Sequence, residues 1–158
     1  MVASLILNLM GGGSQDYAYT DIVDAIRIYG YHAQSDIEEL WKRIAFSILI
    51  NNVDDHLHNH GFLHVGNGRW KLAPAFDINP FPDRERELKT WISYDRGPEA
   101  SLDSLMTVAS YFRISKENGL SIIEGMKKVV SKWRQVGEEM GMSSMELNSF
   151  ENAFLHCG

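Results

Sequence analysis

Residues 51–63 read NNVDDHLHNHGFL, and residues 70–80 read WKLAPAFDINP. The first stretch follows a strongly apolar run, and it is too polar to continue a buried helix. Residues 62–65 and 70–72 have the composition of two short strands, and Gly66 to Gly68 supply the turn between them. The sequence therefore predicts a small β-hairpin with one polar loop before it and a second, proline-containing loop after it.

Helical patterns surround this hairpin on both sides. Residues 37–49 carry apolar side chains at three- and four-residue spacing, which predicts a core helix. The expected helix starts are Thr20, a capping box of Ser35 with Glu38, Ser101, Ser115 (for a helix reaching about Glu139), and a capping box of Ser143 with Glu146. We expect Trp41, Trp70 and Trp133 in the core or in an interface. The predicted fold is mostly α: one domain over residues 1–158, a helical bundle with a small β-hairpin that carries the two loops.

The bulk composition excludes several classes of protein. With a net charge of −6, the chain lacks the basic surface that non-specific nucleic-acid binding needs, so direct DNA binding is not expected. A single cysteine, Cys157, rules out an internal disulfide framework and fits a reducing, cytoplasmic setting. The apolar residues 2–10 are too few to span a bilayer and follow no basic residues, so neither a membrane span nor a signal peptide is predicted.

One interpretation of the two loops is a site for phosphoryl transfer. That reaction requires positioning of the reactants and metal-held neutralisation of charge. In enzymes of this kind an aspartate accepts the hydroxyl proton, and an asparagine five residues later binds the metal. Asp54 and Asn59 have this spacing. A second aspartate, which holds the metal, is required on a loop after a short hairpin, and Asp77 has this position. Carboxylate and amide oxygens are the ligands that Mg²⁺ prefers.

Two other readings of these residues remain open. Asp54, Asp55, His56, His58 and His60 together could hold Zn²⁺ or Mn²⁺ in a metal-dependent hydrolase. A non-catalytic module that binds a partner is the other alternative. Taken residue by residue, Asp55 is expected to be solvated or to cap the loop, and His58 and His60 to lie at the surface or to make hydrogen bonds. The charged residues 83–87 are expected to form a solvated loop.

The loop motifs resemble those of HipA-like serine/threonine protein kinases, bacterial toxins of toxin–antitoxin pairs. These kinases show an N-x-D-x-H-x-(K/R)-N loop followed by an L-x-P-x-(Y/F)-D segment, which residues 52–59 and 72–77 match. The stretches DYAYTDIVDAIRIYG (16–30), ISYDRGPEASLDSLMTVASYFRIS (92–115) and SKWRQVGEEMGMS (131–143) are also similar to that family. The resemblance implies the C-terminal lobe of a protein-kinase-like fold, with the two loops as its catalytic and metal loops.

The resemblance also implies roles for single residues. Asp54 would be the catalytic base, and His56 would brace its loop by hydrogen bonds. Asn59 and Asp77 would hold Mg²⁺. His58 stands where the family mostly has Lys or Arg, and it would contact ATP as a cation only when it is protonated. Asn52 matches the first asparagine of the motif and would support the site from behind.

Further expectations concern the partners. The resemblance implies ATP and Mg²⁺ as cofactors, and a serine or threonine of a protein as acceptor, in an aminoacyl-tRNA synthetase or a translation factor. It also implies a HipB-like helix-turn-helix antitoxin as partner and a role in persistence. No glycine-rich phosphate cover, strand lysine or adenine hinge is found in the sequence, so we expect the N-terminal ATP-binding lobe to be missing and the isolated chain to be weak or inactive.

Overall fold

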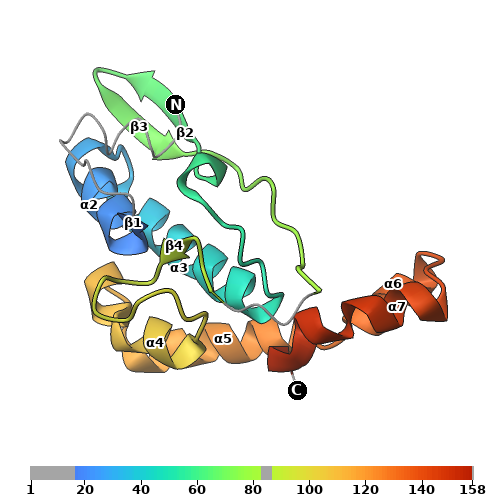
Figure 1. Cartoon of the computed structure of the whole chain (residues 1–158). Coiled ribbons are helices and arrows are strands. Elements are labelled where there is room, and N and C mark those ends of the chain that lie inside the picture. Colours follow the sequence, from blue (N-terminus) through green and yellow to red (C-terminus); the bar gives the residue numbers. More distant parts are fainter. Residues whose placement is uncertain (1–16, 83–86, 158) are drawn as a thin grey trace.

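The computed structural model describes residues 17–82 and 87–157, and its elements are mostly helices (Figure 1). The expectations about residues 2–10 and 83–86 concern segments outside these ranges. The helices are α2 (Tyr19–Tyr29), α3 (Ala33–Leu49), α4 (Leu102–Thr107), α5 (Lys116–Val130), α6 (Trp133–Glu139) and α7 (Ser144–Phe150), with the 3₁₀ helices η1 (Leu57–Asn59), η2 (Ala109–Phe112) and η3 (Glu151–Cys157). The strands are β1 (Tyr17–Ala18), β2 (Phe62–Gly66), β3 (Arg69–Leu72) and β4 (Thr90–Trp91). The mostly helical fold confirms the predicted class.

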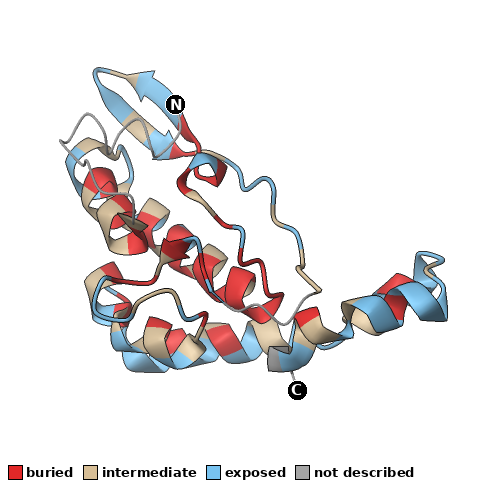
Figure 2. Cartoon of the chain, in the orientation of Figure 1, coloured by how far each residue is buried: buried red, intermediate tan, exposed pale blue. Residues whose placement is uncertain are grey.

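Helix α3 lies at the centre of the core. Its side chains Trp41, Ile44 and Ile48 are at most 1% exposed, because α2, α4 and α5 pack around it (Figure 2). The apolar spacing of residues 37–49 is thus the spacing of a buried helix, as predicted. Trp41 belongs to the core, and Trp70 is half-buried against it. Among the described residues, no helix has the length and apolar content to cross a membrane.

The predicted β-hairpin is present. Strands β2 and β3 pair antiparallel with Phe62 opposite Leu72. The turn uses positive φ angles at Gly66, Asn67 and Gly68, a conformation that glycine and asparagine tolerate. The base of the hairpin is attached to α3, since the backbone N–H of Leu72 donates to Oδ2 of Asp36 at 2.9 Å. The hairpin therefore holds its two flanking loops on a rigid part of the fold.

A second sheet was not predicted from the sequence. Strands β1 and β4 pair in parallel, with Tyr17 opposite Thr90 and Ala18 opposite Trp91. Each strand has only two residues, so alternation of side chains gives no signal in the sequence. This pairing fixes the segment around residue 90 beside the start of α2.

Two of the predicted helix starts were wrong. Helix α2 begins at Tyr19, because the Asp21 carboxylate accepts the backbone N–H of Ala18 at 3.0 Å and leaves Thr20 inside the helix. Helix α3 begins at Ala33 rather than at Ser35. The Glu38 carboxylate accepts from the Gln34 side chain at 3.0 Å, so it does not form the predicted capping box.

The helix starts after the hairpin were predicted correctly. The hydroxyls of Ser101, Ser115 and Ser143 accept backbone N–H groups of the helices that follow them. The long helix expected from Ser115 is divided into α5 and α6, however. The break at residues 131–132 lets Trp133 stack on Phe154, with ring centroids 4.3 Å apart.

Helices α6 and α7 project from the rest of the described chain (Figure 1). Between this projection and α3 lies an apolar groove of about 360 Å³. Its walls include Phe46, Ile50, Val130, Trp133, Phe150 and Phe154. Pro80 lines this groove and also lines a second pocket, formed by the two loops that flank the hairpin, so the groove and the pocket adjoin.

Candidate active site

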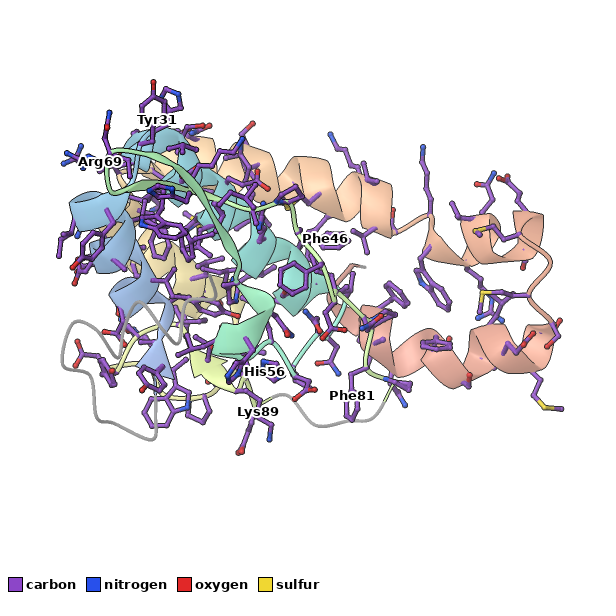
Figure 3. All side chains as sticks on the ribbon, turned by 90° about the horizontal axis from the view of Figure 1, so that it is seen from above. Tyr31, Phe46, His56, Arg69, Phe81 and Lys89 are labelled. Atoms are coloured by element: carbon purple, nitrogen blue, oxygen red, sulfur yellow. The ribbon has the colours of Figure 1, made fainter. Side chains whose placement is uncertain are left out.

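Three of the residues singled out in the sequence meet in one pocket. Asp54, Asn59 and Asp77 all line a cavity of about 390 Å³. Phe81 and Lys89, labelled in Figure 3, belong to its wall. The residues of this active-site pocket therefore come from the loop before the hairpin, the loop after it and the segment leading into β4.

The hairpin explains why distant positions meet. Asn59 comes shortly before β2, and Asp77 comes shortly after β3. Because an antiparallel hairpin returns the chain to its starting point, the loops at its two ends lie together. The backbone N–H of Ala73 donates to the carbonyl of Gly61 at 2.8 Å and extends this pairing beyond the strands.

Asn51 fixes the far end of the second loop. Its backbone adopts φ of 56°, a left-handed conformation in which asparagine is one of the few tolerated residues. The Asn51 side-chain amide donates to the Phe81 carbonyl at 2.9 Å, and the Phe81 N–H donates to the Asn51 carbonyl at 3.3 Å. Asn51, two residues after the end of α3, thus ties the two loops together.

Asp54 and Asn59 are linked directly. The Asn59 side-chain nitrogen donates to the backbone carbonyl of Asp54 at 3.3 Å. This bond leaves the amide oxygen of Asn59 as the atom that can bind a metal. Asn59 is 9% exposed, whereas Asp54 is exposed to solvent in the pocket. A carboxylate in this position can accept a hydrogen bond from an incoming hydroxyl.

Asp77 lies in a strained segment. Its φ of 56° is left-handed, and residues held in this region often lie at functional sites. The Asn79 amide donates to Oδ1 of Asp77 at 2.9 Å and orients the carboxylate. Asn59 and Asp77 therefore offer amide and carboxylate oxygens to one pocket, a donor set that fits Mg²⁺ with water and phosphate oxygens as its other ligands.

Asn52 also lines the pocket and is nearly buried. Its side-chain amide donates to the Ser47 hydroxyl at 3.2 Å, and its backbone N–H donates to the Ser47 carbonyl at 2.8 Å. Both bonds attach the start of the loop to α3.

The histidines of the loop lie elsewhere. His56 and His58 pack edge to face with ring centroids 5.5 Å apart, and neither lines the pocket. The backbone N–H of His56 donates to the Asp54 carbonyl at 2.9 Å, so this residue shapes the loop through its main chain. Nδ1 of His56 is buried without a hydrogen-bond partner among the described residues. The role of His58 in binding ATP stays a prediction.

Asp55 is buried, contrary to the expectation of a solvated or capping residue. Its Oδ2 accepts a 2.6 Å hydrogen bond from the hydroxyl of Tyr19, and its Oδ1 lies 3.1 Å from Nε2 of His60. His60 is 3% exposed, so it is not a surface residue. Burial and the neighbouring carboxylate raise the pKa of Tyr19 well above its usual value, so Tyr19 stays protonated and donates to Asp55.

Metal binding by a cluster of histidines and carboxylates finds no geometric support. Across residues 17–82 and 87–157, no three or more His, Cys, Asp or Glu side chains are grouped so that they could hold a metal ion. Asp55 and His60 are buried and lie against each other, while His56 and His58 pack edge to face and do not line the pocket.

The sequence analysis missed Asn79, Phe81 and Lys89. Asn79 could have been found, because an amide two positions after a carboxylate is a common local hydrogen-bonding pattern. Lys89 gave no such signal. Its place in the pocket depends on the short β1–β4 pairing, which the sequence does not reveal.

Comparisons with known proteins found one family match and one similar protein. Residues 4–133 match the family model described as the HipA-like C-terminal domain. Over 78 residues the chain is 30% identical to a Haemophilus influenzae protein named "Putative kinase". That match covers 47% of this chain and 23% of the relative, so the chain spans well under two thirds of the relative's length.

Proposed function

This chain belongs to the family of HipA-like C-terminal domains, and from that premise we propose that its pocket transfers the γ-phosphate of ATP to a serine or threonine hydroxyl of a protein. One observation carries the proposal. Asp54, Asn59 and Asp77, which come from two loops and match the catalytic and metal positions of kinases, line the same pocket.

Each of these residues has a distinct task in the proposed reaction. The Asp54 carboxylate orients the acceptor hydroxyl and accepts its proton. The amide oxygen of Asn59 and the carboxylate of Asp77 hold Mg²⁺. When bound there, the metal neutralises charge on the phosphate oxygens. The bonds from Asn59 to Asp54 and from Asn79 to Asp77 keep these groups in place before the substrate arrives, which favours catalysis by positioning.

The rest of the nucleotide site belongs to the proposal as well. On the family resemblance we propose that the adenine pocket and the phosphate cover belong to a lobe that precedes this domain. A toxin–antitoxin role, a HipB-like partner, and a translation factor or aminoacyl-tRNA synthetase as substrate have the same basis.

The alternatives differ in their support. A histidine-based hydrolase needs ligands that the fold does not bring together in the described part of the chain. A partner-binding module without catalysis keeps the same fold and would retain nucleotide binding without transfer.

Transfer of labelled phosphate from ATP tests the proposal, using the complete reading frame with Mg²⁺ and a lysate as acceptor. Labelling of serine or threonine by the parent protein and not by Asp54→Ala is the expected result. Binding of ATP by both proteins with no labelling by either would remove the kinase proposal and favour the partner-binding module.

A further inference from the structure

We infer that Lys89 is a further residue of this active site and that its ammonium group contacts the terminal phosphate of the bound nucleotide. The inference rests on the proposed function and adds a residue to it. Lys89 lies in neither loop motif, and it comes from a segment that follows both of them.

The backbone at Lys89 is fixed against the catalytic loop. Its N–H donates to the carbonyl of Val53 at 3.1 Å, and Val53 directly precedes Asp54. The next residue, Thr90, is 1% exposed and pairs with Tyr17 across the two-stranded sheet. Lys89 itself is exposed and lines the pocket. A rigid backbone with a long cationic side chain at the pocket suits phosphate binding.

Binding of a polyphosphate in this pocket needs a positive charge to offset its carboxylates. Its wall carries the carboxylates of Asp54 and Asp77, and Lys89 is the single Lys or Arg among the residues that line it. Two carboxylates repel a polyphosphate, and one bound Mg²⁺ would leave the complex of a nucleoside triphosphate still negative. A lysine ammonium binds phosphate as a point charge and needs no fixed planar geometry. His58 does not line the pocket.

The transfer step assigns Lys89 an electrostatic task. The bond between the γ-phosphorus and the β–γ bridging oxygen breaks, and a bond from the acceptor oxygen to the γ-phosphorus forms. The hydroxyl proton passes to the Asp54 carboxylate, and the nucleoside diphosphate leaves with the bridging oxygen. Throughout this step the Lys89 side chain donates a hydrogen bond to a non-bridging oxygen of the γ-phosphate, where charge is spread in the transition state.

The test uses the complete reading frame carrying Lys89→Met, which keeps most of the side-chain length and removes the charge. Lys89→Arg restores a cation, and Lys71→Met is the matched control, because Lys71 is exposed on β3 and does not line the pocket. Three quantities are measured for each variant: the rate of phosphate transfer, the affinities for MgATP and MgADP, and the thermal unfolding midpoint.

We expect Lys89→Met to transfer phosphate about 10²-fold more slowly, in line with the loss of one preorganised charge contact. Its affinity should fall more for MgATP than for MgADP, since only the triphosphate has the group that Lys89 contacts. Lys89→Arg should recover part of the transfer rate and part of the affinity for MgATP. The thermal unfolding midpoints of all variants should equal that of the parent protein. A merely structural role would lower both affinities equally and shift the midpoint.

The failures of the two proposals can be told apart. If Asp54→Ala abolishes transfer and Lys89→Met leaves the rate and both affinities unchanged, the inference about Lys89 is wrong and the kinase proposal stands. If nothing is phosphorylated but Lys89→Met selectively weakens MgATP binding, the kinase proposal fails and the phosphate contact stands. If the parent protein binds neither nucleotide, both are overturned.

Discussion

The hydroxyl of Tyr19, the first residue of α2, donates a 2.6 Å hydrogen bond to Oδ2 of Asp55, the neighbour of Asp54 in the catalytic loop. His60 lies 3.1 Å from the other oxygen of the same carboxylate. All three residues are at most 5% exposed. This Tyr19–Asp55–His60 network attaches both ends of the segment 55–60 to the core. Asp54 and Asn59 are therefore held in place by residues that do not line the pocket.

The first prediction concerns the hydroxyl of Tyr19. Tyr19→Phe should lower the free energy of unfolding by about 1.5–3 kcal/mol, because it removes a buried hydrogen bond to a charged group. Urea denaturation near pH 8 measures the loss. Tyr31→Phe is the control, since Tyr31 is 59% exposed and its change should be close to zero. Equal stabilities of the parent protein and Tyr19→Phe would show that the bond contributes nothing.

The raised pKa of Tyr19 predicts that the stability of the protein depends on pH. Burial, followed by the charge and hydrogen bond of Asp55, raises the pKa of Tyr19 well above 10.0. Stability from a raised pKa is fully present below the unfolded pKa, and it is lost as pH rises through the folded one. The advantage of the parent protein over Tyr19→Phe should therefore be constant from about pH 7 to 9 and should shrink above about pH 10. An advantage that grew above pH 10 would contradict this sign.

Removal of the two adjacent carboxylates, Asp54 and Asp55, should have unequal effects on stability. Asp55→Ala leaves the buried Tyr19 hydroxyl without its acceptor, so it should cost about 1–3 kcal/mol of unfolding free energy. Asp54→Ala removes an exposed side chain and should change stability by less than about 0.5 kcal/mol. Chemical denaturation of both variants checks the contrast. Similar losses for the two would mean that Asp55 is not the structural member of the pair.

Magnesium dependence tests the two oxygen donors. Asn59→Ala and Asp77→Asn should each raise the Mg²⁺ concentration that gives half-maximal phosphate transfer, by about 10-fold or more, because each removes a metal ligand or its charge. Asp95→Asn is the control, since Asp95 is exposed and outside the pocket. Unchanged magnesium curves for both site variants would remove Asn59 and Asp77 as metal ligands.

Two glycines in helical surroundings should respond oppositely to alanine. A Cβ at Gly125, inside α5, meets nothing within 4 Å, so Gly125→Ala should stabilise the protein by about 0.5–1 kcal/mol through helix propensity. A Cβ at Gly30 would lie 2.4 Å from the carbonyl oxygen of Ile26, so Gly30→Ala should destabilise it. Thermal denaturation of both variants measures the signs. Stabilisation by Gly30→Ala would contradict the close contact at the end of α2.

The sequence predicted the parts of the fold that depend on local patterns. The apolar spacing of α3, the serine caps of later helices and the turn at Gly66 to Gly68 are each encoded within a few residues. The pocket followed from this hairpin, since its return brings Asn59 and Asp77 together. Asp55 was misjudged because its burial depends on Tyr19, thirty-six positions earlier. Lys89 was missed for the same reason, as it is placed by pairing between two-residue strands.

The central claim is that Asp54 accepts the proton of the acceptor hydroxyl. The most direct measurement is the rate of phosphate transfer at saturating MgATP, for the complete reading frame and for its Asp54→Asn variant. The thermal unfolding midpoints of the two proteins are compared as well, to check that both are folded. We predict that Asp54→Asn binds MgATP as the parent protein does and transfers phosphate at least about 10²-fold more slowly, the size typical of a lost general base. An Asp54→Asn variant that phosphorylates its acceptor at the parent rate would contradict the account.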